Sequence, residues 1–359
     1  MRILVLWADG VSSNLGLRAL GAGTEALLRR IWPESDIQFH NYGARVTPVR
    51  VGSVKSAVKE RITGRGRLVT WLAGFDLVVD TRSGDSFSDI YGVSRLTTMS
   101  LMADAVNRAG VPLVIAPQTV GPFGTPTGRL LGWRALRRAD VVMVRDSLSA
   151  RVAADMGRSP DVVATDVVFA LPEPKVTEAR DLLLNVSGLL WADNPHVPSA
   201  QYRENVRRMI RELTTEGRQV TLLAHVLDSP SPDNDVPALR TLAEEFRGLV
   251  DVVVPKDLDQ VRAVVASANL TLGSRMHACL NSLSVGTPAI PLAYSRKFVP
   301  LLQDIGWDRS VDLRESSDPV ADAIGLMSDV EGLARDVRTS VTRARRLLVP
   351  VEDALRALA

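Results

Sequence analysis

The sequence predicts an α/β protein with two doubly wound halves, each built on a largely parallel sheet. Strand-like and helix-like segments alternate along the chain, and the strand-like runs of Val, Ile and Leu show no apolar–polar alternation. Such runs are typical of strands buried on both faces by helices. The length of 359 residues exceeds what one core ordinarily organises, so we expect two domains.

In the first half, short apolar runs predict strands and the amphipathic stretches between them predict helices. The strands are expected at 2–8, 36–40, 76–80, 112–116, 140–144 and 161–164. The helices are expected at 17–31, 53–73, 91–109, 126–138 and 146–156. This alternation is typical of successive strand–helix–strand units in a parallel sheet.

The second half repeats the pattern. Its strands are expected at 181–186, 219–224, 250–254, 268–272 and 288–292. Its helices are expected at 199–216, 235–247, 257–266, 275–285 and 296–305. The Pro-rich stretch 226–237 predicts a mobile surface loop.

Domain limits follow from local composition. The stretch LPEPKVTEAR at 171–180 combines two prolines with a cluster of charges, so we place the boundary there. This gives an N-terminal Rossmann-like domain over 1–172 and a C-terminal one over 178–315. Residues 316–359 are helical in pattern, and one interpretation is that they pack back on the first domain.

Composition excludes several classes of function. The formal net charge is only +2, whereas a protein that binds duplex nucleic acid is usually more basic. One cysteine, Cys279, permits no internal disulfide, and the N-terminal apolar run ends at Asp9, well short of the ~20 residues of a membrane span. With four widely separated histidines and no paired cysteines, we expect no structural zinc site. These features predict a cytoplasmic protein.

The segment GSRMHACL at 273–280 is the strongest functional candidate. It joins a predicted strand to a predicted helix, with Ser274 as the expected N-cap and Arg275 and His277 in the first turn. A helix N-terminus attracts anions, arginine matches carboxylate or phosphate, and histidine titrates near neutrality. The segment therefore predicts an anion site beside a proton-transfer group. The spacing also suits a structural histidine and an arginine in a surface ion pair, and it does not separate the two interpretations.

Polar residues also follow other predicted strands, where ligands of open α/β sheets bind. Arg145 is expected to be a second anion ligand, or an incidental neighbour of a helix cap at Asp146 or Ser147. Lys297 is expected to bind phosphate as a point charge, or to lie in a solvated basic turn. Asp85 is a candidate to accept a proton from a sugar hydroxyl, or it belongs to a loop that caps a helix.

Two further loops carry candidates for substrate binding. In the glycine-rich loop 9–25, Asn14 and Gly16 are placed to approach an acceptor, although the spacing of a dinucleotide-binding motif is absent. In the loop 116–124, Gln118 lies at the expected edge of the ligand site. The basic segment 45–67 is either a contact for an anionic acceptor or a membrane surface, or simply a solvated helix face.

In their order and spacing, these segments resemble the polysaccharide pyruvyl transferase family. The similar stretches cover about residues 10–300 and are Asn-x-Gly at 14–16, SGDSFSDIYG at 83–92, QTVGPF at 118–123, RDSLS at 145–149, GSRMH at 273–277 and AYSRK at 293–297. The resemblance implies a fold similar to GT-B glycosyltransferases, with a ligand cleft between the two domains. It also implies that the acceptor binds the N-terminal domain and the donor binds the C-terminal one.

The resemblance implies transfer of the enolpyruvyl unit of phosphoenolpyruvate to hydroxyls of a nucleotide-linked or lipid-linked sugar, commonly as a pyruvate ketal. Arg145, Arg275, His277 and Lys297 match the family's donor-binding or catalytic positions. We expect the three cations to hold phosphoenolpyruvate, His277 to act as the acid and Asp85 as the base, with no other cofactor. The alternatives are a nucleotide-sugar glycosyltransferase and a non-catalytic binding relative. The acceptor sugar and the oligomeric state stay open.

Overall fold

The computed structural model describes residues 1–41, 58, 62, 67–176, 178–295 and 297–358. The chain forms two compact units. Unit 1 comprises residues 1–10, 20–170 and 344–359, and unit 2 comprises residues 11–19 and 171–343. Residues 11–19 belong to unit 2 although the residues on either side of them belong to unit 1. Residues 344–359 belong to unit 1 although the residues before them belong to unit 2.

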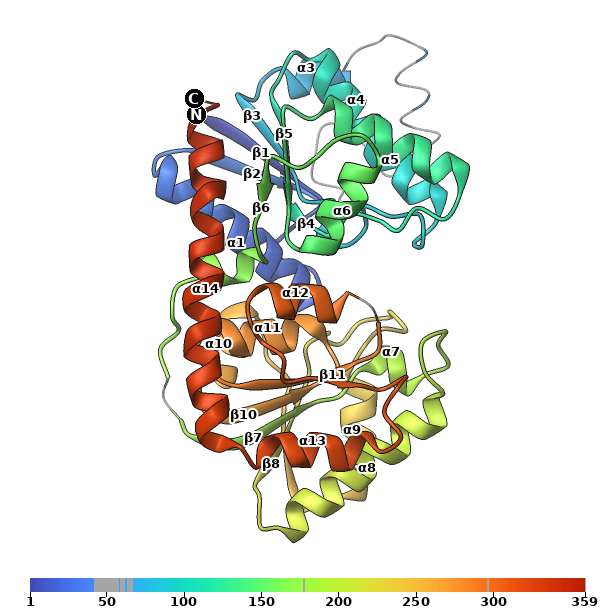
Figure 1. Ribbon diagram of the computed structural model, residues 1–359, viewed down its shortest axis with the longest axis vertical. Coiled ribbons are helices and arrows are strands. Elements are labelled where there is room, and N and C mark those ends of the chain that lie inside the picture. The colour runs from blue at the N-terminus through green and yellow to red at the C-terminus, as the bar shows by residue number, and fades with distance from the viewer. Residues whose placement is uncertain (42–57, 59–61, 63–66, 177, 296, 359) are drawn as a thin grey trace. The chain divides into compact units, whose positions relative to one another are not determined.

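Unit 1 contains one six-stranded parallel sheet in the order β2-β1-β3-β4-β5-β6 (Figure 1). Its strands are β1 (Arg2–Leu6), β2 (Asp36–His40), β3 (Leu77–Asp80), β4 (Leu113–Gln118), β5 (Val141–Val144) and β6 (Val162–Val163). Its helices are α3 (Arg67–Leu72), α4 (Val93–Arg108), α5 (Pro126–Arg138), α6 (Ser147–Asp155), the 3₁₀ turns η1 (Arg82–Gly84) and η2 (Val167–Ala170), and parts of α1 (Leu15–Ile31) and α14 (Val330–Arg356).

Burial explains why the strands of unit 1 are predictable. Every residue of β3 and β4 is buried, and so are all residues of β1 after Arg2, because helices cover both faces of the sheet. The expected helix cap at Asp146 is confirmed, since its carboxylate accepts the backbone N–H of Ser149 at 2.7 Å. The helix expected over 53–73 is described only at 58, at 62 and from 67 onward, where α3 begins.

Unit 2 contains a second six-stranded parallel sheet in the order β12-β11-β10-β7-β8-β9. Its strands are β7 (Arg180–Asn185), β8 (Val220–Leu223), β9 (Val250–Val253), β10 (Ala268–Gly273), β11 (Ala289–Ala293) and β12 (Val311–Asp312). Its helices are α7 (Gly188–Trp191), α8 (Ser199–Thr215), α9 (Val236–Glu245), α10 (Leu258–Ala266), α11 (Met276–Ser284), α12 (Phe298–Asp304), α13 (Pro319–Met327) and the first part of α14. From β9 to β12, this is the 3-2-1-4-5-6 order of a Rossmann fold, so the direction of winding reverses between β7 and β10.

The prediction of a mobile surface loop over 226–237 is wrong at both ends of that stretch. Val226, Asp235 and Val236 are each at most 2% exposed. A polar composition indicates exposure only when the polar side chains face water. Here the Asp235 carboxylate instead accepts hydrogen bonds from buried backbone N–H groups.

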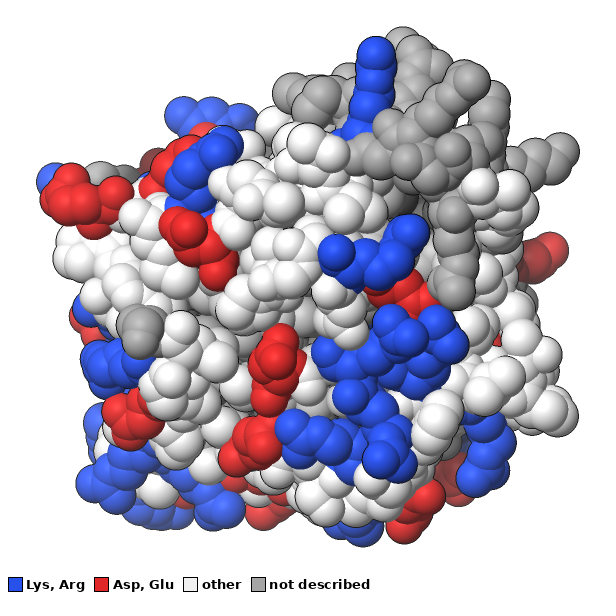
Figure 2. Space-filling view, turned by 90° about the horizontal axis from the view of Figure 1, so that it is seen from above, with Lys and Arg blue, Asp and Glu red and all other residues white. Residues whose placement is uncertain are grey.

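Positive charge is unevenly distributed over the surface. On the face shown in Figure 2, Lys and Arg side chains gather in one dense group with few acidic residues beside them. Most of the basic segment 45–67 lies outside the described residues, so its contact with an anionic acceptor or membrane stays a prediction. In the described parts of the chain, no helix combines the length and low charge needed to cross a bilayer.

Candidate functional site

The candidate site lies in unit 2, where the winding of the sheet reverses. β7 and β10 are neighbours, and Asn185 and Gly273 pair at their carboxyl ends. The Asn185 amide donates to the carbonyl of Leu223 at 2.9 Å and accepts the backbone N–H of Arg275 at 2.9 Å. One side chain therefore joins the ends of β7 and β8 to the start of α11. Ligands of open α/β sheets bind at such an edge.

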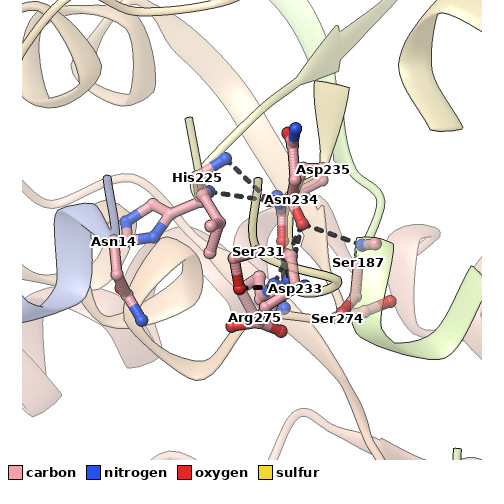
Figure 3. A network of polar contacts seen from close by, with 12 residues as sticks. Asn14, Ser187, His225, Ser231, Asp233, Asn234, Asp235, Ser274 and Arg275 are labelled. Carbon is pink, nitrogen blue, oxygen red and sulfur yellow. Dashed lines mark hydrogen bonds and ion pairs between the residues drawn. The ribbon is translucent and has the colours of Figure 1, made fainter. Parts of the chain in front are cut away.

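Arg275 precedes α11 and is held by two aspartates (Figure 3). Its Nε and Nη2 donate to Oδ1 of Asp235 at 3.1 and 2.7 Å, and its Nη1 donates to Oδ1 of Asp233 at 2.7 Å. Nη2 also donates to the carbonyl of Asp233. Burial opposes the charged form, but the two carboxylates prevail and raise the pKa of Arg275. Arg275 is therefore a fixed cation.

Asp235 organises the loops around Arg275. Its side chain is fully buried, and Oδ1 also accepts the backbone N–H of Gly188 at 2.8 Å. Oδ2 accepts the backbone N–H groups of His225 and Val226 at 2.9 and 2.8 Å. These bonds compensate for the cost of burying a carboxylate. One group thus fixes the loops after β7 and β8 and the arginine before α11.

The prediction that Ser274 caps α11 is wrong. The N-cap residue is Arg275, and its side chain makes no capping hydrogen bond. Ser274 Oγ instead accepts a hydrogen bond from the Tyr202 hydroxyl at 2.8 Å, and the same hydroxyl accepts the backbone N–H of Ser187 at 2.9 Å. Burial raises the pKa of Tyr202 to about 12. The serine therefore holds α8 against the site.

Two histidines lie beside Arg275. Nε2 of the buried His225 is 3.2 Å from Nδ2 of Asn281, which also donates to the carbonyl of His277 at 2.8 Å. An amide nitrogen only donates, so His225 Nε2 accepts and its proton is on Nδ1. Burial, then the neighbouring His277 and Arg275, hold the pKa of His225 well below its usual range. His225 is therefore neutral near pH 7.

The loop with Asn14 and Gly16 packs against these histidines. Asn14 pairs with Val226 in an antiparallel bridge, and its side chain accepts the N–H of Gly16 at 2.9 Å. A Cβ at Gly16 would lie 2.8 Å from Cγ of His277, so only glycine fits there. Figure 3 shows Asn14 next to His225. From the sequence, this loop is expected in the N-terminal domain, because no local feature indicates that it packs on the sheet of unit 2.

Lys297 lies at the same edge of the sheet, after β11, as the residue that precedes α12. Its charge lowers the pKa of His196, although burial contributes more to that shift. The His196 ring packs on Tyr294 with centroids 5.1 Å apart. The unit 2 candidates, Asn14, Gly16, Ser274, Arg275, His277 and Lys297, thus gather around one sheet edge.

The other candidates lie in unit 1. Arg145 and Asp166 are buried and form an ion pair at 2.7 Å, and Arg145 Nε donates to Thr119 Oγ1 at 2.9 Å. Asp85 is half-buried and accepts a hydrogen bond from the Tyr91 hydroxyl at 2.8 Å. Gln118 ends β4, and within the described part of unit 1 neither of its buried amide atoms has a hydrogen-bond partner.

Gln118 ends β4, Arg145 follows β5 directly, and Asp85 lies in the loop after β3, so all three lie at the carboxyl ends of adjacent strands. The loop after β3 is strained, because Arg82 and Ser83 adopt φ values of 46° and 54°. Backbone strain of this kind clusters at ligand sites. The grouping of Arg145 with the cations of unit 2 stays a prediction.

Sequence reasoning missed most of the residues that hold Arg275 and His277 in place. His225 follows the strand expected at 219–224, so the criterion that found Arg145 would also have found it, whereas Asn185 lies inside the strand expected at 181–186 and ends β7. Asp233 and Asp235 carried no such signal, because they lie in a stretch with the composition of a surface loop. Across the described ranges, no three His, Cys, Asp or Glu side chains are grouped in a way that would hold a metal ion.

Two parallel sheets covered by helices place the chain in the α/β class, and solved structures show that it is GT-B-like. UDP-GlcNAc 2-epimerase from Neisseria meningitidis is similar over 99% of this chain and 100% of its own, with a TM-score of 0.61 and 11% identity. The O-GlcNAc transferase of Thermobaculum terrenum is similar over 100% of this chain and 67% of its own, with a TM-score of 0.53 and 15% identity. The predicted fold class is confirmed.

The family is established by sequence. A sequence model of the polysaccharide pyruvyl transferase family matches residues 14–296. The chain belongs to this family, as the order of its motifs indicated. The amylovoran biosynthesis protein AmsJ of Erwinia amylovora is 23% identical over 304 residues, which cover 77% of this chain and 71% of that protein.

Proposed function

We propose that the protein transfers the pyruvyl group of phosphoenolpyruvate to hydroxyls of a sugar acceptor, forming a pyruvate ketal during polysaccharide biosynthesis. The observation that carries the proposal is the gathering of Arg275, His277 and Lys297 at one edge of the unit 2 sheet. Membership of the polysaccharide pyruvyl transferase family supports a transferase, and similarity to AmsJ supports a role in polysaccharide biosynthesis.

The charge of the donor matches this edge. Phosphoenolpyruvate carries a carboxylate and a phosphate, which a planar guanidinium and a mobile ammonium bind in complementary ways. Arg275 is held rigidly by Asp235, so its position does not depend on the ligand. A cation fixed before substrate arrives costs no reorganisation during the reaction. Arg275 would therefore orient the donor, and the Lys297 ammonium would bind its phosphate and adjust to the position of that group.

The chemistry needs one acid and one base. A proton from His277 goes to C3 of phosphoenolpyruvate while a sugar hydroxyl attacks C2 and forms a C–O bond. The proton of that hydroxyl goes to a base, for which Asp85 stays the prediction. The bond between C2 and the phosphate oxygen then breaks, and phosphate leaves as hydrogen phosphate with the proton that the base took up. A second hydroxyl attacks C2 and closes the ketal, and its proton restores the acid. The products are one ketal and one phosphate, with no change in oxidation state.

Phosphate release tests the proposal. The full chain is mixed with phosphoenolpyruvate and a panel of nucleotide-linked and lipid-linked sugars, and phosphate and product mass are followed. We expect release with at least one acceptor and a loss of at least 100-fold in His277→Asn, as for removal of a general acid. Full turnover by a folded His277→Asn variant would refute the role of His277. Transfer of a sugar from a nucleotide sugar, without use of phosphoenolpyruvate, would instead establish a glycosyltransferase.

A further inference from the structure

We propose that Asp233 is a competitor for the donor: its carboxylate occupies the anion position on Arg275 and is displaced when phosphoenolpyruvate binds. This inference rests on the proposed function and assigns to that site a residue that sets donor affinity. It follows from a difference between the two carboxylates that Arg275 holds (Figure 3).

The two aspartates are bound to Arg275 in different ways. Asp235 has no exposed side-chain surface and accepts two hydrogen bonds from Arg275 and three from backbone N–H groups. The side chain of Asp233 is 33% exposed, and its carboxylate accepts one hydrogen bond, from Arg275 Nη1, within the described residues. Removing Asp235 would break five bonds. Turning the Asp233 carboxylate into water would break one, which water replaces.

The backbone around Asp233 is fixed, so only the side chain needs to move. Asn234 donates to Asp228 Oδ1 at 2.8 Å and to the carbonyl of Ser229 at 3.0 Å. The Asn234 carbonyl packs so closely on Gly188 that a Cβ at Gly188 would lie 1.9 Å from it. Because the Asp233 carbonyl still accepts from Arg275 Nη2, rotation of the carboxylate frees Nη1 and leaves the arginine in place.

Charge prevents the Asp233 carboxylate and a bound anion from contacting Arg275 Nη1 at the same time. Arg275 with Asp233 and Asp235 carries a net charge of about −1, so a dianion that approaches Nη1 meets repulsion until the Asp233 carboxylate leaves. A ligand with several anionic oxygens replaces the lost bond and gains further ones, whereas a simple monocarboxylate gains little. Asp233 therefore lowers the affinity of Arg275 for every anion that binds at Nη1.

The variant Asp233→Asn tests this, because it keeps the shape of the side chain and removes its charge. Binding of phosphoenolpyruvate, inorganic phosphate and lactate to the full chain is measured by titration calorimetry. We expect affinity for phosphoenolpyruvate to rise about tenfold, and the affinities for phosphate and lactate to rise by a similar factor. Asp251→Asn removes the same charge from an exposed residue of unit 2 and is expected to leave all three affinities unchanged. If Asp233→Asn melts early, Asp233→Ser takes its place.

Unchanged or weaker anion binding in the folded charge-removed variant would overturn the inference, since Asp233 would then only clamp Arg275. The same conclusion follows if neither protein binds any of the anions. If phosphate binding strengthens but phosphoenolpyruvate binds neither protein, the competitor role stands and the proposed donor is wrong. The two proposals are thus separable in one set of titrations.

Discussion

Arg275 and Asp235 are joined by two hydrogen bonds from one guanidinium to a single carboxylate oxygen, at 3.1 and 2.7 Å, with the carboxylate fully buried. They are 40 residues apart in sequence. The pair fixes a guanidinium in place at a strand-to-helix junction. Its loss would affect both the stability of unit 2 and the position of the proposed donor.

Asp235→Asn is expected to lower the free energy of unfolding by ~3 kcal/mol, because it removes the more buried of the two carboxylates that hold Arg275 and turns an amide NH₂ toward backbone donors. Chemical denaturation followed by circular dichroism measures this. Glu204→Gln removes an exposed partner of Arg211 and should change stability little. Equal effects of the two substitutions would contradict the central role of Asp235.

Substitutions in the buried pair of Arg145 and Asp166 distinguish a structural role of Arg145 from a functional one. Arg145→Met should cost ~3 kcal/mol, since the buried Asp166 carboxylate loses the cation that it pairs with. Adding Asp166→Leu should restore most of that stability, as replacement of a whole buried pair often does. If Arg145 only stabilises the fold, the double variant should regain phosphate release as well as stability. We expect the double variant to fold and to stay inactive.

Tyr202→Phe removes the hydroxyl that accepts from the backbone of Ser187 and donates to Ser274. Leaving a buried N–H without a partner costs ~1–3 kcal/mol, and we expect a loss of that size in denaturation experiments. Tyr91→Phe, at a residue that is 44% exposed, is the matched control and should be nearly neutral. A neutral Tyr202→Phe would show that water readily replaces the hydroxyl.

Stability should fall in mildly acidic solution because of His225. Its pKa is depressed in the fold, so below about pH 6.5 the unfolded chain binds a proton that the folded chain does not. Unfolding therefore becomes easier as pH falls, by at most ~1.4 kcal/mol per pH unit. His225→Gln keeps an acceptor near Asn281 and does not titrate. Its melting temperature should drop less than that of the wild type between pH 8 and pH 5.5, and parallel drops would refute the assignment.

The sequence predicts the strands and the position of the site because both depend on local pattern. Buried parallel strands are apolar throughout, and the residues that follow them are candidates for ligand binding, which is why the sequence points to Arg275, His277 and Lys297. The start of α11 was misplaced because the Ser274 hydroxyl is bound by Tyr202, 72 residues away in sequence. Likewise, no local feature of Asp233 or Asp235 shows that their carboxylates meet an arginine. Long-range partners of polar side chains are set by the fold.

Titration of the full chain with phosphoenolpyruvate and, separately, with UDP-GlcNAc tests the central claim most directly. The account predicts that phosphoenolpyruvate binds at one site per chain, and that Lys297→Met weakens this binding at least tenfold. Lys175→Met, at an exposed residue of unit 2 away from the site, should bind like the wild type. Binding of UDP-GlcNAc without binding of phosphoenolpyruvate would contradict it.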